Sequence, residues 1–177
     1  ISLGLVGSEM CIRDSSYTKR FTAFCHLILG LGLALAPIGA YLAVSGEFNI
    51  IPLFFSAAVL FWVSGFDIIY ALQDETFDKQ FNLHSIPVLL GQKNALRFSR
   101  IVHIITAAII LFIGINYFTS STLFWIATTL FIGLLINQHR LIKPHDLSKI
   151  NVVFFTNNGI ASLIFGSLIV IELITNN

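Results

Sequence analysis

Near the middle of the chain, acidic side chains follow a long apolar run, in the segment GFDIIYALQDETFDKQ at residues 65–80. At about 100° per residue of an α-helix, Asp67 and Asp74 differ by about 20° around the axis, and Asp74 and Asp78 by about 40°. If the helix continues beyond the apolar run, the three carboxylates share one face, where like charges repel unless a cation neutralises them. Hard oxygen ligands of this kind suit Mg²⁺, which commonly takes one or two carboxylates together with phosphate oxygens. The pattern therefore indicates a site for Mg²⁺ and a diphosphate.

An alternative interpretation of the last three acids is an ordinary solvated face. Asp74, Glu75 and Asp78 could lie at the membrane surface and pair with Lys79, as charged side chains beside an apolar segment commonly do. Asp67 is harder to explain in this way, because it lies about one turn inside the apolar run. A carboxylate at such a position is costly, so we treat Asp67 as a functional candidate.

The composition decides which solvent surrounds the chain. Of 177 residues, 56% are hydrophobic and only 11% are charged, whereas a soluble domain carries roughly a quarter charged residues. The mean hydropathy is +0.86, which indicates an integral membrane protein whose partner is the lipid bilayer. The net charge of +1 gives no basis for a nucleic-acid partner, and we expect none. The two cysteines and five histidines show no metal-site spacing.

Five apolar runs approach the length of about 20 residues that an α-helix needs to cross a bilayer. They are residues 21–44, 51–72, 101–117, 123–137 and 152–173. The fourth run is short, and it could extend into its polar flank. Isolated strands are excluded because their backbone groups would be unpaired in lipid. The sequence thus predicts an all-α integral membrane protein, a multi-span bundle with five transmembrane helices.

Lysine and arginine are confined to alternate connections between these runs. They precede the first run and lie between the second and third and between the fourth and fifth, whereas residues 45–50 and 118–122 contain none. The excess of positive charge marks the cytoplasmic side of a membrane protein. We therefore expect the acidic residues that follow Leu72 to be cytoplasmic as well.

The first 15 residues, ISLGLVGSEMCIRDS, need separate treatment because they begin with Ile and are too short to span a membrane. They also lack the cationic start and apolar centre of a signal peptide. We expect residues 1–15 to be a non-native, artefactual segment, and we base no function on them.

Three segments together resemble a known family. GFDIIYALQDETFD at residues 65–78, followed by LHSIPVLLG at 83–91, is similar to the second aspartate-rich motif of the UbiA-type membrane prenyltransferases. SYTKRFT at residues 16–22 is similar to the family's Tyr-x-Lys-Arg segment, which leads into a central span. The resemblance is closest to the branch that prenylates 4-hydroxybenzoate, and it extends from about Ser16 to the last residue.

The resemblance implies a bundle of nine transmembrane helices in a bacterial inner membrane, with two aspartate-rich motifs facing a central cavity. In such proteins the motifs bind Mg²⁺ and the diphosphate of a polyprenyl donor, which ionises to an allylic cation that an aromatic ring attacks. By motif matching, Asp74 and Asp78 are the metal-binding pair, and Asp67 is the upstream catalytic aspartate. Arg20 matches a basic residue that binds the carboxylate of the aromatic acid, and Lys19 is its neighbour in substrate binding.

The sequence departs from the family in one large respect. The first motif, Asn-Asp-x-x-Asp-x-x-x-Asp, is nowhere in the 177 residues. We therefore interpret residues 16–177 as the C-terminal part of a UbiA-type prenyltransferase domain, corresponding to the last five of nine helices. The chain alone is expected to be inactive.

Two other classes of function stay open. A family member with another acceptor, of the menaquinone-pathway or haem type, would carry the same acids. An ion-coupled transporter would also place Asp67 within a helix, although its site should lie near the membrane midplane.

Aromatic residues near the acids, Phe66, Tyr70 and Phe77, could stabilise an allylic cation, but ordinary packing is the favoured interpretation.

Overall fold

The computed structural model describes residues 17–144 and 146–175, so the expected non-native segment 1–15 lies outside the described residues. Within them the regular elements are helices, joined by turns and short connections, with an isolated bridge between Lys143 and Asp146. Five helices are long and apolar enough to cross a membrane, which confirms the expected fold class and number of spans. The chain divides into two compact units, the first ending at Thr106 and the second beginning at Ala107.

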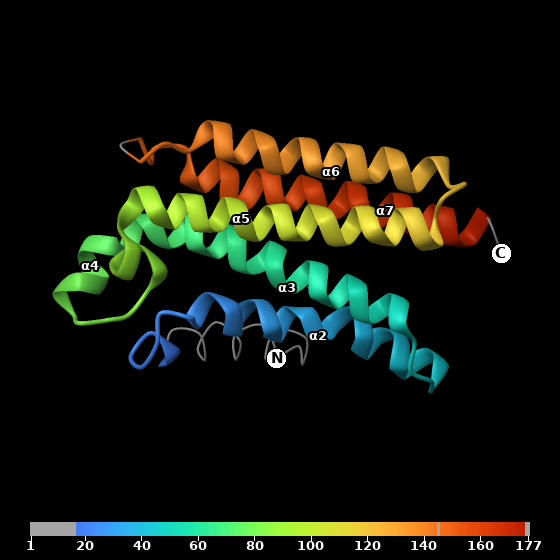
Figure 1. Cartoon of the computed structure of the whole chain (residues 1–177), viewed down its shortest axis with the longest axis horizontal. Helices are drawn as coiled ribbons and strands as arrows, with labels where there is room; N and C mark the ends of the chain where they lie inside the picture. The colour runs from blue at the N-terminus through green and yellow to red at the C-terminus, as the bar shows by residue number, and fades with distance from the viewer. Residues whose placement is uncertain (1–16, 145, 176–177) are drawn as a thin grey trace, which may run out of the picture. The chain divides into compact units, whose positions relative to one another are not determined.

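The first unit contains an antiparallel helical pair, α2 (Cys25–Ser45) and α3 (Ile50–Tyr70). Gly46 ends α2 in the left-handed conformation, with φ of 69°, which a residue with a side chain rarely adopts. The Asn49 side chain then caps α3 by accepting a 2.9 Å hydrogen bond from the Ile51 amide. The turn is therefore tight, and the two helices pack side by side (Figure 1). As a result, the beginning of α2 lies beside the end of α3.

The acidic segment does not continue α3 as a regular α-helix. A 3₁₀ segment, Ala71–Asp74, follows α3, and the short helix α4 (Glu75–Gln80) comes after it. A 3₁₀ segment advances about 120° per residue instead of about 100°, so Asp67, Asp74 and Asp78 do not follow one α-helical stripe. The single acidic face expected from the sequence is thus replaced by carboxylates that point to different neighbours.

Helix α5 spans Ile86–Tyr117, with a kink at Gly91, whose φ of 74° and ψ of 161° are not helical. We expected the third span to begin at residue 101, where the continuous apolar run starts. The helix begins earlier because the segment between the kink and that run continues the same backbone hydrogen bonding with polar side chains on its surface. The hydropathy pattern thus located the span but not the beginning of the helix.

The first part of α5 approaches the end of α3 closely. The Ser99 hydroxyl donates a 2.7 Å hydrogen bond to the carbonyl oxygen of Gly65, and both residues are buried. A Cβ at Gly65 would overlap the ring of His103. Glycine at this position therefore lets the two helices meet, which fixes the acidic segment relative to α5.

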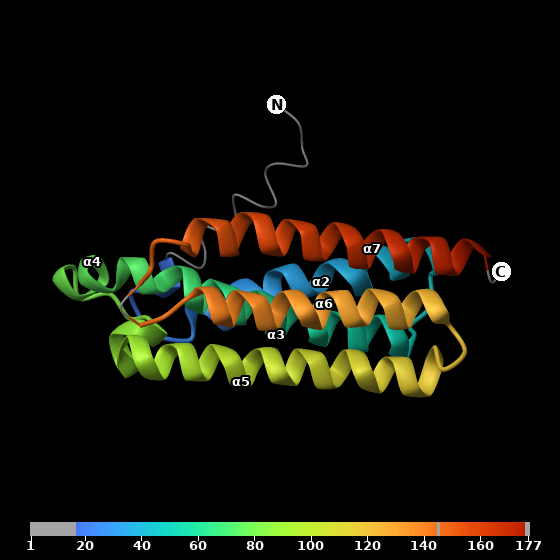
Figure 2. The ribbon, with the colours of Figure 1, turned by 90° about the horizontal axis from the view of Figure 1, so that it is seen from above.

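The second unit contains the rest of α5, α6 (Thr122–Leu141), a π-helical turn (Val152–Asn157) and α7 (Asn158–Thr175). The hydroxyl of Ser121 caps α6 by accepting a 3.0 Å hydrogen bond from the Phe124 amide. The short fourth run is completed by the polar residues at its end, which makes α6 long enough to be a candidate span of 20 residues. Helices α6 and α7 run side by side (Figure 2).

Aromatic rings hold α6 and α7 together. The Phe165 ring of α7 lies with its centroid 6.3 Å from that of Phe124 and 5.4 Å from that of Phe131, both on α6. Phe124 also stacks on Phe118 in the preceding turn, at 4.7 Å. Because side chains between membrane helices associate by close packing, these rings fix the turn before α6 against both helices.

Candidate functional site

The site begins with an ion pair between residues 59 positions apart in the sequence, Lys19 and Asp78. The Lys19 ammonium lies 3.3 and 3.1 Å from the two carboxylate oxygens of Asp78. Asp78 lies on the short helix α4, and 2% of its side chain and 20% of the Lys19 side chain are exposed. The backbone of Lys19 is anchored too, because its carbonyl accepts a 2.6 Å hydrogen bond from the His84 amide. A carboxylate so deeply buried requires a cation beside it.

A second pair links α2 to α3, about one turn before the end of α3. His26, at the start of α2, has its Nδ1 atom 2.7 Å from a carboxylate oxygen of Asp67, and its ring is 1% exposed. The Ile86 amide donates to Nε2 of the same ring at 3.4 Å. A neutral imidazole with its hydrogen on Nδ1 satisfies both contacts. His26 therefore orients Asp67 and ties α2, α3 and the start of α5 together.

The sequence did not identify His26 as part of the site, because a histidine near the end of a span is commonly an ordinary interfacial side chain. A lone histidine has no spacing that distinguishes a partner of a carboxylate from an interfacial side chain. Asp67 could have pointed to it. Burying a carboxylate within an apolar helix costs free energy, so such a carboxylate needs a partner on a neighbouring element.

Asp74 lies between these two pairs in the sequence and is half-buried. It is close enough to Lys19, Asp78 and Asp67 to be influenced by their charges. Among the described residues its carboxylate has no hydrogen bond or ion pair. The neighbouring Glu75 turns to Lys79 on the same helix, at 2.6 Å. Asp74 is thus the anionic group of the segment that retains its oxygens for another ligand.

The carboxylates of this segment meet the requirements of a Mg²⁺ site in part. In residues 17–144 and 146–175 no group of three or more acidic, histidine or cysteine side chains is arranged to hold a metal ion. Mg²⁺ usually keeps several waters and takes one or two carboxylates together with phosphate oxygens, so it does not need such a group. Asp74 and Asp78 supply the hard oxygens that this mode of binding uses. The residues present fit a metal ion that is bound jointly with a phosphorylated ligand.

Arg20 lies apart from the Lys19 and Asp78 pair. Its guanidinium lies 5.5 Å from the centroid of the Tyr17 ring, a distance suited to a cation–π contact. The residue also lines a pocket of about 380 Å³ together with Phe77 and Phe81, whose ring centroids are 4.5 Å apart. Phe77 is 55% exposed, so part of its ring is accessible to a ligand. A cation beside two aromatic rings can bind a flat molecule that carries a carboxylate.

These features define the class of protein. Apolar helices of spanning length, with two carboxylate pairs and an exposed arginine at one end of the first unit, make an integral membrane protein with a polar site at the ends of its helices. The sequence profile of the UbiA prenyltransferase family matches residues 11–159, and the chain belongs to this family.

Individual relatives agree with this assignment. The chain is 26% identical to a 4-hydroxybenzoate octaprenyltransferase of Francisella tularensis subsp. novicida over 84% of its own length and 52% of the relative's. It is 27% identical to a protein of the same name from Tolumonas auensis, over 92% and 56% of the two lengths. The solved apo structure of a UbiA homologue from Aeropyrum pernix is similar with a TM-score of 0.76 and 27% identity, over 94% of this chain and 62% of that one. The chain spans about half the length of the curated relatives that it matches.

Proposed function

We propose that the chain takes part in the transfer of a polyprenyl group from a polyprenyl diphosphate to 4-hydroxybenzoate or a similar aromatic acid, as a step of quinone biosynthesis. Membership of the family and the names of the relatives support this reaction class. The observation that carries the proposal is the pairing of Lys19 with Asp78 beside Asp74. It gathers anionic oxygens and an ammonium at the ends of apolar helices, where a diphosphate with a lipid-soluble chain would lie.

The cofactor proposed for this reaction is Mg²⁺. Asp74 and Asp78 would hold it through carboxylate oxygens, and the bound ion would neutralise the charge of the departing diphosphate. Lys19 would then be free to donate hydrogen bonds to phosphate oxygens, since its present partner would face the metal. His26 would keep the Asp67 carboxylate in one orientation beside them.

The proposed location is a bacterial inner membrane, with the acidic end of the first unit facing the cytoplasm. This orientation rests on the confinement of lysine and arginine to alternate connections between the spans. A water-soluble aromatic acid would reach the site from the cytoplasm, while the prenyl chain would remain in the bilayer.

The pocket beside Arg20 is the proposed binding site for the aromatic acid. In an active protein of the length of the curated relatives that carries this chain, Arg20→Ala is expected to raise KM for 4-hydroxybenzoate about 10-fold or more, because a charge-assisted contact to its carboxylate is lost. The KM for the prenyl donor should change much less, since the donor's phosphates lie with Lys19 and the acids. Steady-state kinetics with each substrate varied in turn measure the two effects.

Arg100→Ala provides the matched control, because Arg100 is exposed on α5 and does not line the pocket. It should leave both KM values close to those of the parent. A larger effect of Arg20→Ala on the donor than on the acid would assign Arg20 to the diphosphate instead.

The proposal as a whole is tested by an assay of Mg²⁺-dependent prenylation of 4-hydroxybenzoate. The 177-residue chain is expected to show no transfer alone, because it carries one aspartate-rich motif and its longer relatives extend well beyond it. Co-expression with the N-terminal helices of a full-length relative should restore transfer. Robust transfer by the chain alone would refute the need for a second acidic motif, and no transfer in either case, with both parts inserted in the membrane, would contradict the proposed reaction.

A further inference from the structure

One face of α5 gathers positive charge just before the apolar run of that helix. Lys93, Arg97 and Arg100 are exposed, and on a helix that turns about 100° per residue they lie within about 60° of one another. Among the described residues, none of the three side chains forms an ion pair. The sequence of α5 also contains no Asp or Glu that could neutralise them. We call these three cations the basic face of α5.

The basic face differs from the face of α5 that packs against α3. Ser99 donates its 2.7 Å hydrogen bond to the Gly65 carbonyl, and the His103 ring lies where a Cβ of Gly65 would be. The buried residues of this part of α5 are Ala95, Leu96, Ser99, Val102, His103 and Thr106. The middle of that buried face lies roughly 130° around the helix from the middle of the basic face. The basic face is therefore turned away from the end of α3, and the diphosphate site proposed there does not account for it.

The basic face lies at the depth that lipid headgroups occupy. Arg100 immediately precedes the apolar run 101–117, and Lys93 lies only about 10 Å further along the helix axis, at about 1.5 Å per residue. This length is comparable to the headgroup region of one leaflet. On the apolar side, Ile101 and Ile104 are 56% and 60% exposed, and Ile104 lies at about the same angle as the cations. The surface thus offers cations to a phosphate and an apolar strip to acyl chains.

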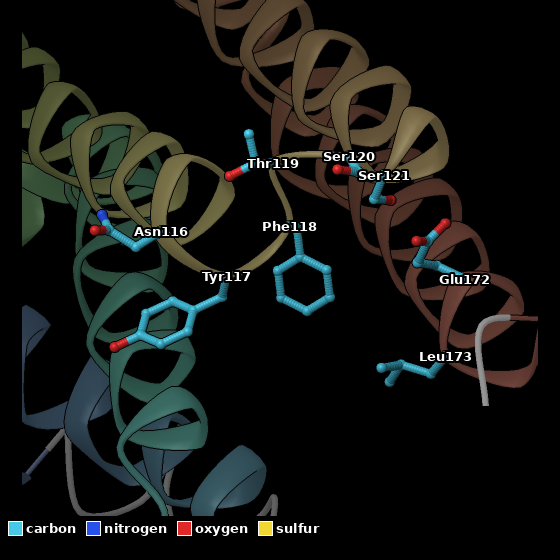
Figure 3. A pocket seen from close by; sticks show the side chains of 8 residues that line it. All are labelled: Asn116, Tyr117, Phe118, Thr119, Ser120, Ser121, Glu172 and Leu173. Atoms are coloured by element: carbon cyan, nitrogen blue, oxygen red, sulfur yellow. The ribbon is translucent and has the colours of Figure 1, made fainter.

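The other end of α5 carries no such charge. Its last turn has no basic residue, and Figure 3 shows Asn116 and Tyr117 there, beside a pocket of about 450 Å³. None of the described residues that line this pocket is Lys, Arg or His. Because only the first end of α5 is basic, its charge would select lipids in one leaflet of the membrane.

We propose that the basic face of α5 binds an anionic phospholipid, with the phosphate at the three cations and an acyl chain along Ile104. Arginine donates two parallel hydrogen bonds to phosphate oxygens, and long cationic side chains reach toward headgroups from the end of a span. Each Lys or Arg near a membrane surface favours an anionic lipid by roughly 5-fold. The proposal is independent of prenyl transfer, and the KM values of that reaction are not expected to depend on this face.

The first test measures which lipids the purified chain retains, by native mass spectrometry after incorporation in nanodiscs of mixed phosphatidylglycerol and phosphatidylcholine. Both lipids carry a phosphate, but only phosphatidylglycerol has a net negative charge. It should be retained about 10-fold more than phosphatidylcholine. Equal retention of the two lipids by the wild-type chain would overturn the proposal without any variant.

The second test assigns the preference to α5. The double variant Lys93→Gln/Arg97→Gln removes exposed side chains and no buried contact, so its unfolding temperature in phosphatidylcholine nanodiscs should match that of the parent. Its preference for phosphatidylglycerol should fall to about 2-fold or less.

The matched control is Lys143→Gln/Lys149→Gln, which removes the same charge from exposed positions between α6 and α7. The alternation of spans places this connection on the same side of the membrane. The control should keep the preference of the wild-type chain. An undiminished preference in Lys93→Gln/Arg97→Gln, or an equal fall in the control, would overturn the assignment to the basic face.

Inorganic phosphate distinguishes a lipid from a soluble anion. A large excess of phosphate, added at constant ionic strength, should leave phosphatidylglycerol bound, because free phosphate makes no contact with the apolar strip and is not concentrated by the bilayer. Loss of phosphatidylglycerol in the presence of phosphate, but not of an equal ionic strength of chloride, would show that the basic face binds a soluble phosphate instead of a lipid.

Discussion

Replacing Asp78 by Asn is expected to lower prenyl transfer at least about 100-fold in an active protein of the length of the curated relatives that carries this chain. The amide fits the same space, but it has no negative charge with which to bind Mg²⁺, and it no longer neutralises Lys19. Asp74→Asn should have an effect of the same order, because, within the described segment 67–80, its carboxylate is the one with no hydrogen bond or ion pair. Turnover with saturating Mg²⁺, together with the amount of protein inserted in membranes, measures the loss.

Glu75→Gln provides the control for both changes. Glu75 lies between the two aspartates in the same segment, but its carboxylate pairs with Lys79 within α4 at 2.6 Å. Such a pair within one helix contributes only about 0.3–0.5 kcal/mol, and its loss should leave turnover nearly unchanged. Near-wild-type transfer in Asp78→Asn, or an equal loss in Glu75→Gln, would disprove the metal assignment.

The number and placement of the spans could be predicted from the sequence because the bilayer imposes a minimum length on apolar helices. The structure has five candidate spans, and each contains most of one predicted run. Helix ends were predicted less well. Helix α5 begins at Ile86, well before its apolar run. The hydropathy pattern does not show this beginning, because polar side chains are compatible with a helix outside the bilayer.

The sequence made Asp67, Asp74 and Asp78 candidates for the site, but it did not predict the contacts that the structure gives them. Asp67, Asp74 and Asp78 were found from one helical spacing, which assumed an unbroken helix. The 3₁₀ segment changes that spacing, so that Asp67 turns to His26 and Asp78 turns to Lys19. Both partners come from the segment around the start of α2, far away in the sequence. A periodicity within one helix carries no information about which neighbour each of its faces meets.

The pairing of Lys19 with Asp78 has a consequence for metal binding. Its ammonium occupies the carboxylate that the proposed Mg²⁺ would use, so the ion must displace Lys19 in order to bind. The pair would therefore neutralise a buried charge until the proposed metal ion and diphosphate bind together. Arginine would be less suitable at this position, since its bidentate hydrogen bonds to a carboxylate would be harder for a metal ion to replace.

Lys19→Met tests this exchange. Without metal, the variant is expected to lose about 3–5 kcal/mol of stability, because the Asp78 carboxylate, 2% exposed, is left without its counter-ion. Saturating Mg²⁺ should recover a large part of that loss, since the ion meets no competitor at Asp78. Thermal unfolding in detergent, over a series of Mg²⁺ concentrations, measures both effects in the 177-residue chain and requires no catalytic activity.

Lys79→Met separates the exchange from a general loss of positive charge. Lys79 lies next to Asp78 in the sequence, but its ammonium pairs with Glu75 and its side chain is 54% exposed. Its replacement should therefore cost little, and the dependence of unfolding on Mg²⁺ should be that of the parent. If Lys19→Met shows no larger response to Mg²⁺ than Lys79→Met does, Lys19 is a structural partner of Asp78 that the metal never displaces. If the response is larger only in Lys19→Met, Asp78 binds the ion, and the Lys19 ammonium occupies the position of the metal in the absence of Mg²⁺.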